Sequence, residues 1–509
     1  MRVEYTDMRM LPARLIWLLL TIVPCSAWAQ AWVAPGDPGL RRLVERLVDE
    51  RAIDLPTLNW PIPRRDLEAA IASARARKDL APRVVADLAE LETRLGVPST
   101  HSNSAGTWSV AAGDPTDLRG FVDAPRARGE ASFNWNWQDP ASMGEARWSG
   151  ELHVTAALDP ADGTALQPDG SYLSLSLGNA LLTAGWQDRW WGSGSDGSLQ
   201  LSSNARPVFA LSLDRERSTP FESRWLRWLG PWTMGTFMGV LENHRKDFDR
   251  PLLWGFHSAA RPLPGLEISV TRNAQFCGRG RPCGPTIFWN MLTGRDNRGE
   301  NVSAAKEPGN QVATYEIRWS GEVGGRPIAV SYQDTGETID NKIPRPLRSL
   351  ELISLATWGD YNAATRWRAH LEFTSTTCSD FNYAQAADCG YENGIFTGGY
   401  RYRGRVLGHS TDSDSRQYTL GLALDDGRSS REVLLRRAEI NRIGTIPQVN
   451  HLLAPNGPQT WWALEGYWRT AYGRGRLELQ AGLEHRRDDL RGKTTTDPRG
   501  WVRYVAPLR

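Results

Sequence analysis

Histidine, net charge and metal-binding motifs are all scarce in this sequence of 509 residues. Sixty basic and 58 acidic side chains leave a formal net charge of +2, so the chain offers no broad electrostatic attraction to nucleic acid. The eight histidines are scattered without an H-E-x-x-H motif, and no C-x-x-C occurs, so the sequence gives no support for a zinc site. We therefore expect no metal, no cofactor and no nucleic-acid partner.

Recognised catalytic motifs are missing as well. No G-x-S-x-G elbow occurs, and spacing alone does not define a Ser-His-Asp triad. The nearest approach to a glycosidase site is a set of neighbouring carboxylates: Asp247 with Asp249, Asp425 with Asp426, and Asp488 with Asp489. Because each pair lies in a segment typical of a turn or loop, we interpret them as solvated surface groups. The sequence favours a protein that is not an enzyme, and an exported polysaccharide-modifying enzyme is an alternative.

A long apolar run occurs only near the N-terminus, so we expect no helix to span a bilayer in the mature chain. There, two arginines precede apolar residues 15–23, and Ala-Trp-Ala at 27–29 matches a cleavage signature. Residues 1–29 are interpreted as a secretory signal peptide, which would carry Cys25 away with it. The mature chain is expected to begin near Gln30.

Four cysteines remain after the predicted cleavage, and they form two local couples in the sequence. An exported, oxidising setting favours one disulfide between Cys277 and Cys283 and another between Cys378 and Cys389. Four cysteines permit three connectivities, and free thiols are a further alternative.

Residues 36 to about 96 show an apolar period near 3.6, which predicts three short helices. Asp37 before Pro38 is typical of a helix start, and Leu40, Leu43, Val44 and Leu47 then share one face. A second helix is predicted around residues 67–71, and a third over 84–95 ends at Gly96. Three such helices bury little surface by themselves, so the bundle assigned to residues 30–104 needs another surface to pack against.

From about residue 107 to the end, the apolar period is two. Residues 147–158 alternate apolar and polar side chains, and the same pattern returns at 313–319, 366–373 and 476–484. Charges of both signs on the polar faces argue against a sandwich with two buried interiors.

Two architectures explain long alternating strands: a soluble sheet protein, or a membrane barrel with its apolar face outside. A signal peptide, strands of 9 to 12 residues and aromatic residues near strand ends favour the barrel. Those aromatic residues are Tyr172, Trp186, Trp232, Trp319, Trp358, Trp461 and Trp462. The fold class is therefore mostly β, with a transmembrane antiparallel β-barrel over residues 105–509 that carries long loops.

A cluster of tryptophans lies in GWQDRWWGSGSDGSLQLSSNARP, which begins at Gly185. Gly192, Gly194 and Gly197 match G-x-G-x-x-G, but the following residues alternate and offer no helical face, so we interpret the match as accidental.

The same stretch is the most specific part of a resemblance that covers most of the mature chain. It comprises WWG at 190–192, GSL at 197–199, LS at 201–202 and NA at 204–205, followed by RPVFALSLDRERSTPFESRWLRWLGPW. With the helical stretch PGLRRLVERLVDERAIDLPTLNWPIPRRDLEAAI, these residues resemble the capsule assembly protein Wzi family of outer-membrane proteins.

The resemblance implies a short periplasmic helical bundle followed by an outer-membrane barrel of about 18 strands. It also implies a lectin, not an enzyme, that binds and anchors capsular or related surface polysaccharide and so assists capsule assembly. One departure concerns the C-terminus. Many outer-membrane barrels end in an aromatic residue, whereas this chain ends in Leu508-Arg509, which leaves the position of the last strand open.

Two groups of side chains are candidates for polysaccharide binding, because sugar rings stack on aromatic faces and their hydroxyls pair with polar groups. The first group is Trp186, Asp188, Arg189, Trp190, Trp191 and Asn204. Arg189 has the planar fork that suits a uronic-acid carboxylate. The alternative is structural: the tryptophans pack a loop into the barrel mouth or sit in the interfacial girdle.

The second group is basic: Arg279 and Arg281 between the paired cysteines, and Arg401, Arg403 and Arg405 in YRYRGR, whose tyrosines should point away from the arginines. A solvated polar lumen balanced by acidic residues is the alternative. Counting strands backward from the cysteine loops places the tryptophan loop outside the cell, whereas counting forward can place it inside, so its sidedness stays open.

The expected location is the cell outer membrane. The expected partners are capsular or extracellular polysaccharide, outer-membrane lipid and the polysaccharide export machinery, and the protein is expected to be a monomer. A diffusion channel or porin for charged solutes is the main functional alternative.

Overall fold

The computed structural model describes most of the chain after residue 29. The described residues are 30–96, 104–138, 146–293, 309–336, 338–339, 346–347, 349–380, 383–386, 390–442, 453–454 and 457–508. The predicted signal peptide, residues 1–29, lies outside them, so its assignment stays a prediction.

Three helices precede the barrel: α2 (Pro38–Asp49), α3 (Arg64–Arg75) and α4 (Pro82–Leu95). The Asp37 side chain accepts a hydrogen bond from the Leu40 amide at 3.1 Å, which caps α2 as the sequence predicts. Gly96 ends α4 in the left-handed conformation, with φ 63°. Strand β1 (Trp32–Val33) precedes α2, and two further short strands, β2 (Asn59–Trp60) and β3 (Ile62–Pro63), lie between α2 and α3.

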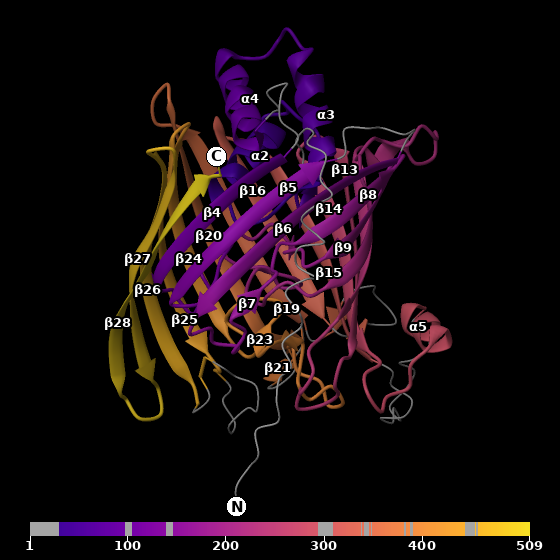
Figure 1. Ribbon diagram of the computed structural model, residues 1–509, viewed down its shortest axis with the longest axis vertical. Coiled ribbons are helices and arrows are strands. Elements are labelled where there is room, and N and C mark those ends of the chain that lie inside the picture. The colour runs from indigo at the N-terminus through magenta and orange to yellow at the C-terminus, as the bar shows by residue number, and fades with distance from the viewer. Residues whose placement is uncertain are drawn as a thin grey trace, which may run out of the picture.

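Eighteen antiparallel strands form a closed barrel (Figure 1). They are β4 (Ser104–Asp114), β5 (Gly129–Gln138), β6 (Ala146–Leu158), β8 (Tyr172–Leu177), β9 (Ala180–Gly185), β11 (Ala210–Arg215), β12 (Trp232–Val240), β13 (Leu252–Leu263), β14 (Leu266–Phe276), β15 (Gly309–Val323), β16 (Arg326–Gly336), β19 (Ser349–Asp360), β20 (Thr365–Asp380), β24 (Arg416–Asp426), β25 (Ser429–Ile440), β26 (Gln459–Tyr472), β27 (Gly475–Asp488) and β28 (Thr494–Pro507). The last strand, β28, pairs with the first, β4, which closes the barrel and leaves no open edge.

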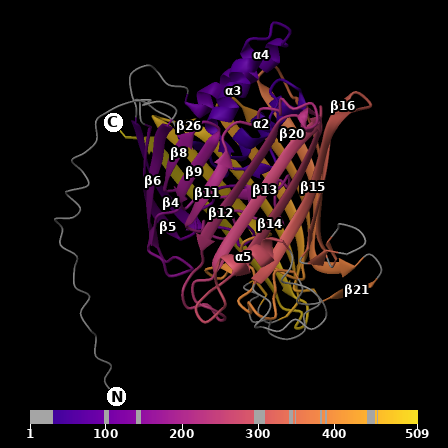
Figure 2. The same cartoon turned by 90° about the vertical axis from the view of Figure 1, so that its right-hand side faces the viewer.

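Smaller elements lie in the connections between the barrel strands. They are β7 (Leu166–Gln167), β10 (Trp190–Trp191), η1 (Arg227–Leu229), α5 (Pro285–Leu292), β17 (Thr338–Ile339), β18 (Pro346–Leu347), β21 (Tyr383–Ala386), β22 (Arg401–Tyr402) and β23 (Arg405–Val406). Helix α5 lies beside the barrel wall at the end opposite α2–α4 (Figures 1 and 2). The sequence predicts no helix here, because eight residues between two strands are too few to show a helical period.

The outer surface of the barrel is apolar. In β24, the side chains of Tyr418, Leu420 and Leu422 are 45–51% exposed, whereas Gln417 and Thr419 between them are buried toward the interior. The period-two pattern therefore faces its apolar side outward, as a membrane barrel does toward lipid. Among the described residues, no helix has both the length and the apolar character needed to cross a membrane.

The two ends of the barrel differ. At the end that carries α2–α4, several strand pairs are joined by two-residue turns, such as 264–265, 324–325, 427–428 and 473–474. At the other end the connections are long, including 241–251, 277–308 and 381–415 (Figure 1). The three helices therefore lie at the short-turn end of the barrel, opposite the long connections.

Candidate functional site

Helix α2 is fixed to the inside of the barrel wall by buried ion pairs. Arg42 contacts Asp425 at 2.7 Å and Glu432 at 3.0 Å, and Arg318 contacts Asp49 at 2.7 Å. Folding removes these carboxylates and guanidinium groups from water, so each buried charge is stabilised mainly by its partner. The barrel wall is therefore the surface that the small helical bundle needs, and it explains why α2 carries charges on a buried face.

The segment between α2 and α3 reaches further into the lumen. Glu267 on β14 accepts hydrogen bonds from the backbone amides of Thr57 and Leu58, at 2.7 and 2.9 Å. Strand β2 then pairs with β10, so that Trp60 lies opposite Trp190. The segment between α2 and α3 and the loop that follows β9 therefore meet inside the barrel.

We call residues 186–209 the plug loop, because the chain leaves β9 at the long-loop end and folds back into the lumen. Residues 190–208 are almost all buried although they are rich in serine and glycine. Arg41 of α2 donates to the carbonyl oxygens of Gly192, Ser193 and Gly194 at 2.8–3.2 Å. Asp196 of the loop forms an ion pair with Arg436 on β25 at 2.6 Å. The plug loop is thus attached to both α2 and the wall.

The predicted tryptophan site is part of this plug. Trp190 is fully buried, and its indole N–H donates to the Gly192 carbonyl at 3.1 Å. Trp191 is 3% exposed and packs against the rings of Phe237 and His257. Trp186 is half-buried against the exposed ring of Phe209. These positions favour the structural interpretation of the tryptophans, because the faces of Trp190 and Trp191 are covered by protein.

The polar members of that predicted group separate. Asp188 lines a narrow cavity of about 260 Å³ between the plug and strands β4–β6. Burial raises the pKa of Asp188 to about 7. The Arg189 guanidinium lies 4.3 Å from the ring centre of Phe237, and burial lowers its pKa to about 10. Asn204 instead contacts Arg405, which donates to its side-chain oxygen at 3.1 Å.

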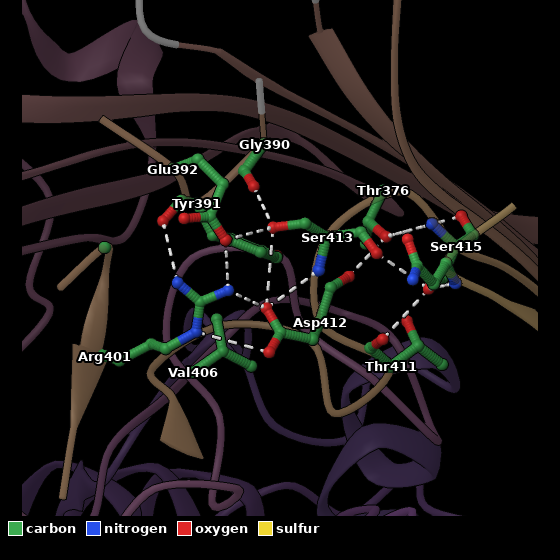
Figure 3. A network of polar contacts seen from close by, with 12 residues as sticks. Thr376, Gly390, Tyr391, Glu392, Arg401, Val406, Thr411, Asp412, Ser413 and Ser415 are labelled. Atoms are coloured by element: carbon green, nitrogen blue, oxygen red, sulfur yellow. Dashed lines mark hydrogen bonds and ion pairs between the residues drawn. The ribbon is translucent and has the colours of Figure 1, made fainter. Parts of the chain in front are cut away.

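A second inward loop, residues 390–415, packs on the plug loop. Figure 3 shows its central contact, in which Arg401 bridges Glu392 and Asp412. Tyr391 and Tyr400 are buried, and their hydroxyls donate to the carbonyl oxygens of Leu199 and Gln200. Of the YRYRGR arginines, Arg401 is therefore a structural residue, because its charge is used inside the loop.

The cysteine loop lies elsewhere. Cys277 and Cys283 form a disulfide. Between them, Arg279 is exposed and Arg281 lies over the rings of Phe248 and Phe396. Cys378 is also disulfide-bonded, and its predicted partner Cys389 lies outside the described residues.

A cavity of about 550 Å³, which we call the mouth pocket, lies at the long-loop end of the barrel. The first loop after β4, the loop after β6 and the tip of the β22–β23 hairpin form its walls. Six arginines line it: Arg119, Arg126, Arg128, Arg206, Arg403 and Arg405. Four aspartates, Asp114, Asp117, Asp159 and Asp162, together with Thr116 and one aromatic residue, Tyr402, complete the polar lining. Arg403 and Arg405 were sequence candidates, and the other four arginines were missed.

The arginines that sequence analysis missed carry no local motif. Arg119, Arg126 and Arg128 lie between β4 and β5, and Arg206 lies at the end of the plug loop. Only the inward folding of two loops brings these residues to Arg403 and Arg405. A cluster of arginines in 119–128 was the one available signal. In the described part of the chain, no group of three or more His, Cys, Asp or Glu residues is arranged to hold a metal ion.

Comparison with known proteins identifies relatives of this chain. The sequence model of a family described as capsule assembly protein Wzi matches residues 126–495. An uncharacterised 55.8 kDa protein in the cps region of Klebsiella pneumoniae is 26% identical over 331 residues, which span 64% of this chain and 62% of that protein. The chain therefore matches less than two thirds of the relative's length.

A solved structure shows the fold. Wzi of Escherichia coli, described as an outer-membrane, carbohydrate-binding β-barrel involved in group 1 capsule assembly, is similar with a TM-score of 0.78 and 20% identity. That alignment covers 94% of this chain and all of the other chain. OprD of Pseudomonas aeruginosa matches with a TM-score of 0.46 and 9% identity, over 80% of this chain and 95% of that chain.

Proposed function

Because this chain belongs to the capsule assembly protein Wzi family, we propose that it binds capsular or related surface polysaccharide and holds it at the outer membrane. Retention of this kind needs non-covalent contacts and no bond cleavage. The E. coli relative is described as carbohydrate-binding, which agrees with this proposal.

The observation that carries the proposal is the contrast between a filled lumen and an open mouth. Helix α2 enters from the periplasmic end and the two inward loops from the other end. Buried ion pairs attach α2 and the plug loop to the barrel wall, and a buried ion pair between Arg401 and Asp412 holds the second inward loop together. The mouth pocket, in contrast, lies among the extracellular loops and is lined by charged groups. This arrangement favours binding at the surface over diffusion of solutes through the barrel.

The chemistry of the mouth pocket suits a polymer of sugars. Guanidinium groups donate several hydrogen bonds in a fixed plane, and an aromatic side chain offers a flat apolar face. A sugar residue needs both kinds of contact, and a polysaccharide repeats each weak contact along its length. Modest affinity for one residue is therefore sufficient to retain a long chain.

The test is the partition of surface polysaccharide between cells and medium. Cells that lack the protein and cells that express it should be compared at equal total polymer synthesis. We expect more shed polymer without the protein, and restoration of cell-bound polymer on expression. Unchanged partition would contradict the proposal. An unrelated barrel expressed at the same level controls for general changes in the envelope.

A further inference from the structure

The arginines of the mouth pocket differ from the other buried arginines in what neutralises them. In the lumen, Arg42, Arg318, Arg401 and Arg436 each contact at least one carboxylate within 3.0 Å. In the mouth pocket, Arg119 and Arg126 have no carboxylate oxygen within 4.0 Å of their guanidinium nitrogens among the described residues. Their hydrogen bonds go to uncharged groups instead.

Backbone carbonyl oxygens hold these two side chains in place. Arg119 is 6% exposed and donates to the carbonyls of Pro125, at 2.9 Å, and Ala124. Arg126 donates to the carbonyls of residues 203, 204 and 205 at 2.9–3.0 Å. Carbonyl oxygens orient a guanidinium group but supply no negative charge. Asp123 acts on both arginines, and Glu130 on Arg119, only from beyond 4.0 Å. The positive charge of both groups is therefore only partly neutralised, and the remainder acts on the pocket beside them.

A third arginine adds to this excess. The nearest acidic oxygen to Arg405 belongs to Asp117 at 4.0 Å, and the side chain is 29% exposed. Burial and the nearby Arg126 lower the pKa of Arg405, and burial with Arg126 and Arg405 lowers that of Arg119. Arg403 is 32% exposed and shares Asp162, at 3.5 Å, with Arg206. The lining therefore presents more positive charge than its aspartates neutralise.

Excess positive charge of this kind is unusual for arginines that serve only the stability of the fold. An uncompensated charge costs free energy when it is desolvated, so a cluster at one place needs a compensating partner. The pocket's volume of about 550 Å³ is in the range that encloses small ligands. Tyr402 on β22 adds the aromatic surface.

We propose that the mouth pocket binds an acidic sugar residue of the surface polysaccharide, with its carboxylate held by Arg403 and Arg405 in the field of Arg119 and Arg126. This inference rests on the proposed function and narrows it to polymers with carboxyl groups. A carboxylate supplies the negative charge that the carbonyl oxygens lack, and it accepts two hydrogen bonds from one guanidinium fork.

The test uses full-length protein in detergent and the surface polysaccharide purified from the producing strain. One sample of polymer is native, and in the other its carboxyl groups are reduced to primary alcohols. We expect the native polymer to bind at least about tenfold more tightly, because charge-assisted hydrogen bonds are lost on reduction. The difference should shrink as salt is raised.

Variants locate the effect. The double variant Arg403→Gln with Arg405→Gln should lose about tenfold or more in affinity for native polymer and bind reduced polymer as before. The matched control is Arg487→Gln with Arg491→Gln, which removes two exposed arginines at the same end of the barrel but outside the pocket lining. It should leave both affinities unchanged. Heat-dependent migration in gels confirms that each variant is folded.

The outcomes separate this inference from the proposed function. Three results would overturn the inference and leave the proposed function standing: equal affinity for native and reduced polymer, a naturally neutral polymer that binds as tightly as the acidic one, or equal losses of affinity in both double variants. Inorganic phosphate is also used to displace bound native polymer. If phosphate displaces it as effectively as unlabelled native polymer does, at the same concentration of negative charge, the inference is overturned, because the site would then be a general anion site. Binding of neither polymer would overturn the proposed function itself.

Discussion

The arginines of the lumen and those of the mouth pocket have the same side chain but different partners. In the lumen, Arg436 lies between Asp196 and Glu465, and all three are nearly inaccessible to water. In the mouth pocket, Arg119 and Arg126 are oriented by carbonyl oxygens. A charge satisfied by protein carboxylates belongs to the structure, whereas a charge held only by dipoles is available to a ligand. The number of arginines in a region says less about binding than what neutralises them.

The largest effect is expected from a variant that lacks most of the plug loop. Strands β9 and β11 pair from Gly185 to Ala210, so a short Gly-Ser linker can replace residues 190–207 and close the hairpin. We expect this variant to conduct ions in planar bilayers and the native protein to conduct few, because this segment fills the lumen. Shortening residues 489–493 serves as a control and should change nothing. A deletion variant without conductance would show that α2 and the second inward loop close the barrel alone.

Breaking a lumen ion pair should have the next largest effect. Arg436→Gln leaves the carboxylates of Asp196 and Glu465 buried without their cation. We expect a loss of about 3–5 kcal/mol in the free energy of unfolding, measured by denaturant titration in detergent. Arg405→Gln in the mouth pocket should cost less than about 1 kcal/mol, since no close carboxylate depends on it. Similar losses in both variants would erase the distinction between the two regions.

The tryptophans test whether the plug takes part in binding. Trp190 is buried against the helical bundle, next to Phe121. Trp190→Ala should destabilise the protein by about 3 kcal/mol or more through the cavity it leaves. The affinity of the folded fraction for surface polysaccharide should stay unchanged, as measured by equilibrium binding below the unfolding transition. A large loss of affinity in the fully folded variant would instead show that Trp190 takes part in polysaccharide binding.

A smaller effect on stability is expected when the pH is lowered, through Asp162 in the mouth pocket. Burial opposes ionisation of Asp162, but Arg206 and Arg403 hold its pKa below the usual value of 3.8. A depressed pKa means that this contact stabilises the folded state above pH 3.8 and that the contribution disappears as the pH falls through the folded pKa. We expect the wild type to exceed Asp162→Asn in stability by less than about 1 kcal/mol at pH 6. The two unfolding midpoints should converge below pH 3.8, and a constant difference would contradict the assignment.

Much of the fold is predictable from sequence because it depends on local and periodic patterns. Period-two alternation marks the barrel strands, with the apolar side outward, and the Asp37 cap and Gly96 mark helix ends that the structure confirms. The resemblance to the Wzi family supplies the strand number of about 18 and the outer-membrane location, which are confirmed. Helix α5 was missed because eight residues are too few to show a period clearly.

The candidate site was less predictable, because it depends on where loops go after they leave the strands. Asn204 and Arg405 are 201 residues apart in sequence and 3.1 Å apart in the fold. No pattern within either segment shows that both fold inward. Trp190 and Trp191 looked suited to stacking on sugars, and only packing shows that other protein groups already cover them.

The sequence by itself therefore determined the barrel, the leading helices and the family, because alternation, caps and family motifs are properties of short segments. Only the tertiary structure decided which charges are paired. Whether an arginine such as Arg401 or Arg405 meets a carboxylate depends on residues brought together by loop folding, and electrostatic interaction depends on distance in space. The same six-residue stretch, YRYRGR, contains one arginine used to hold a loop together and two that face the mouth pocket.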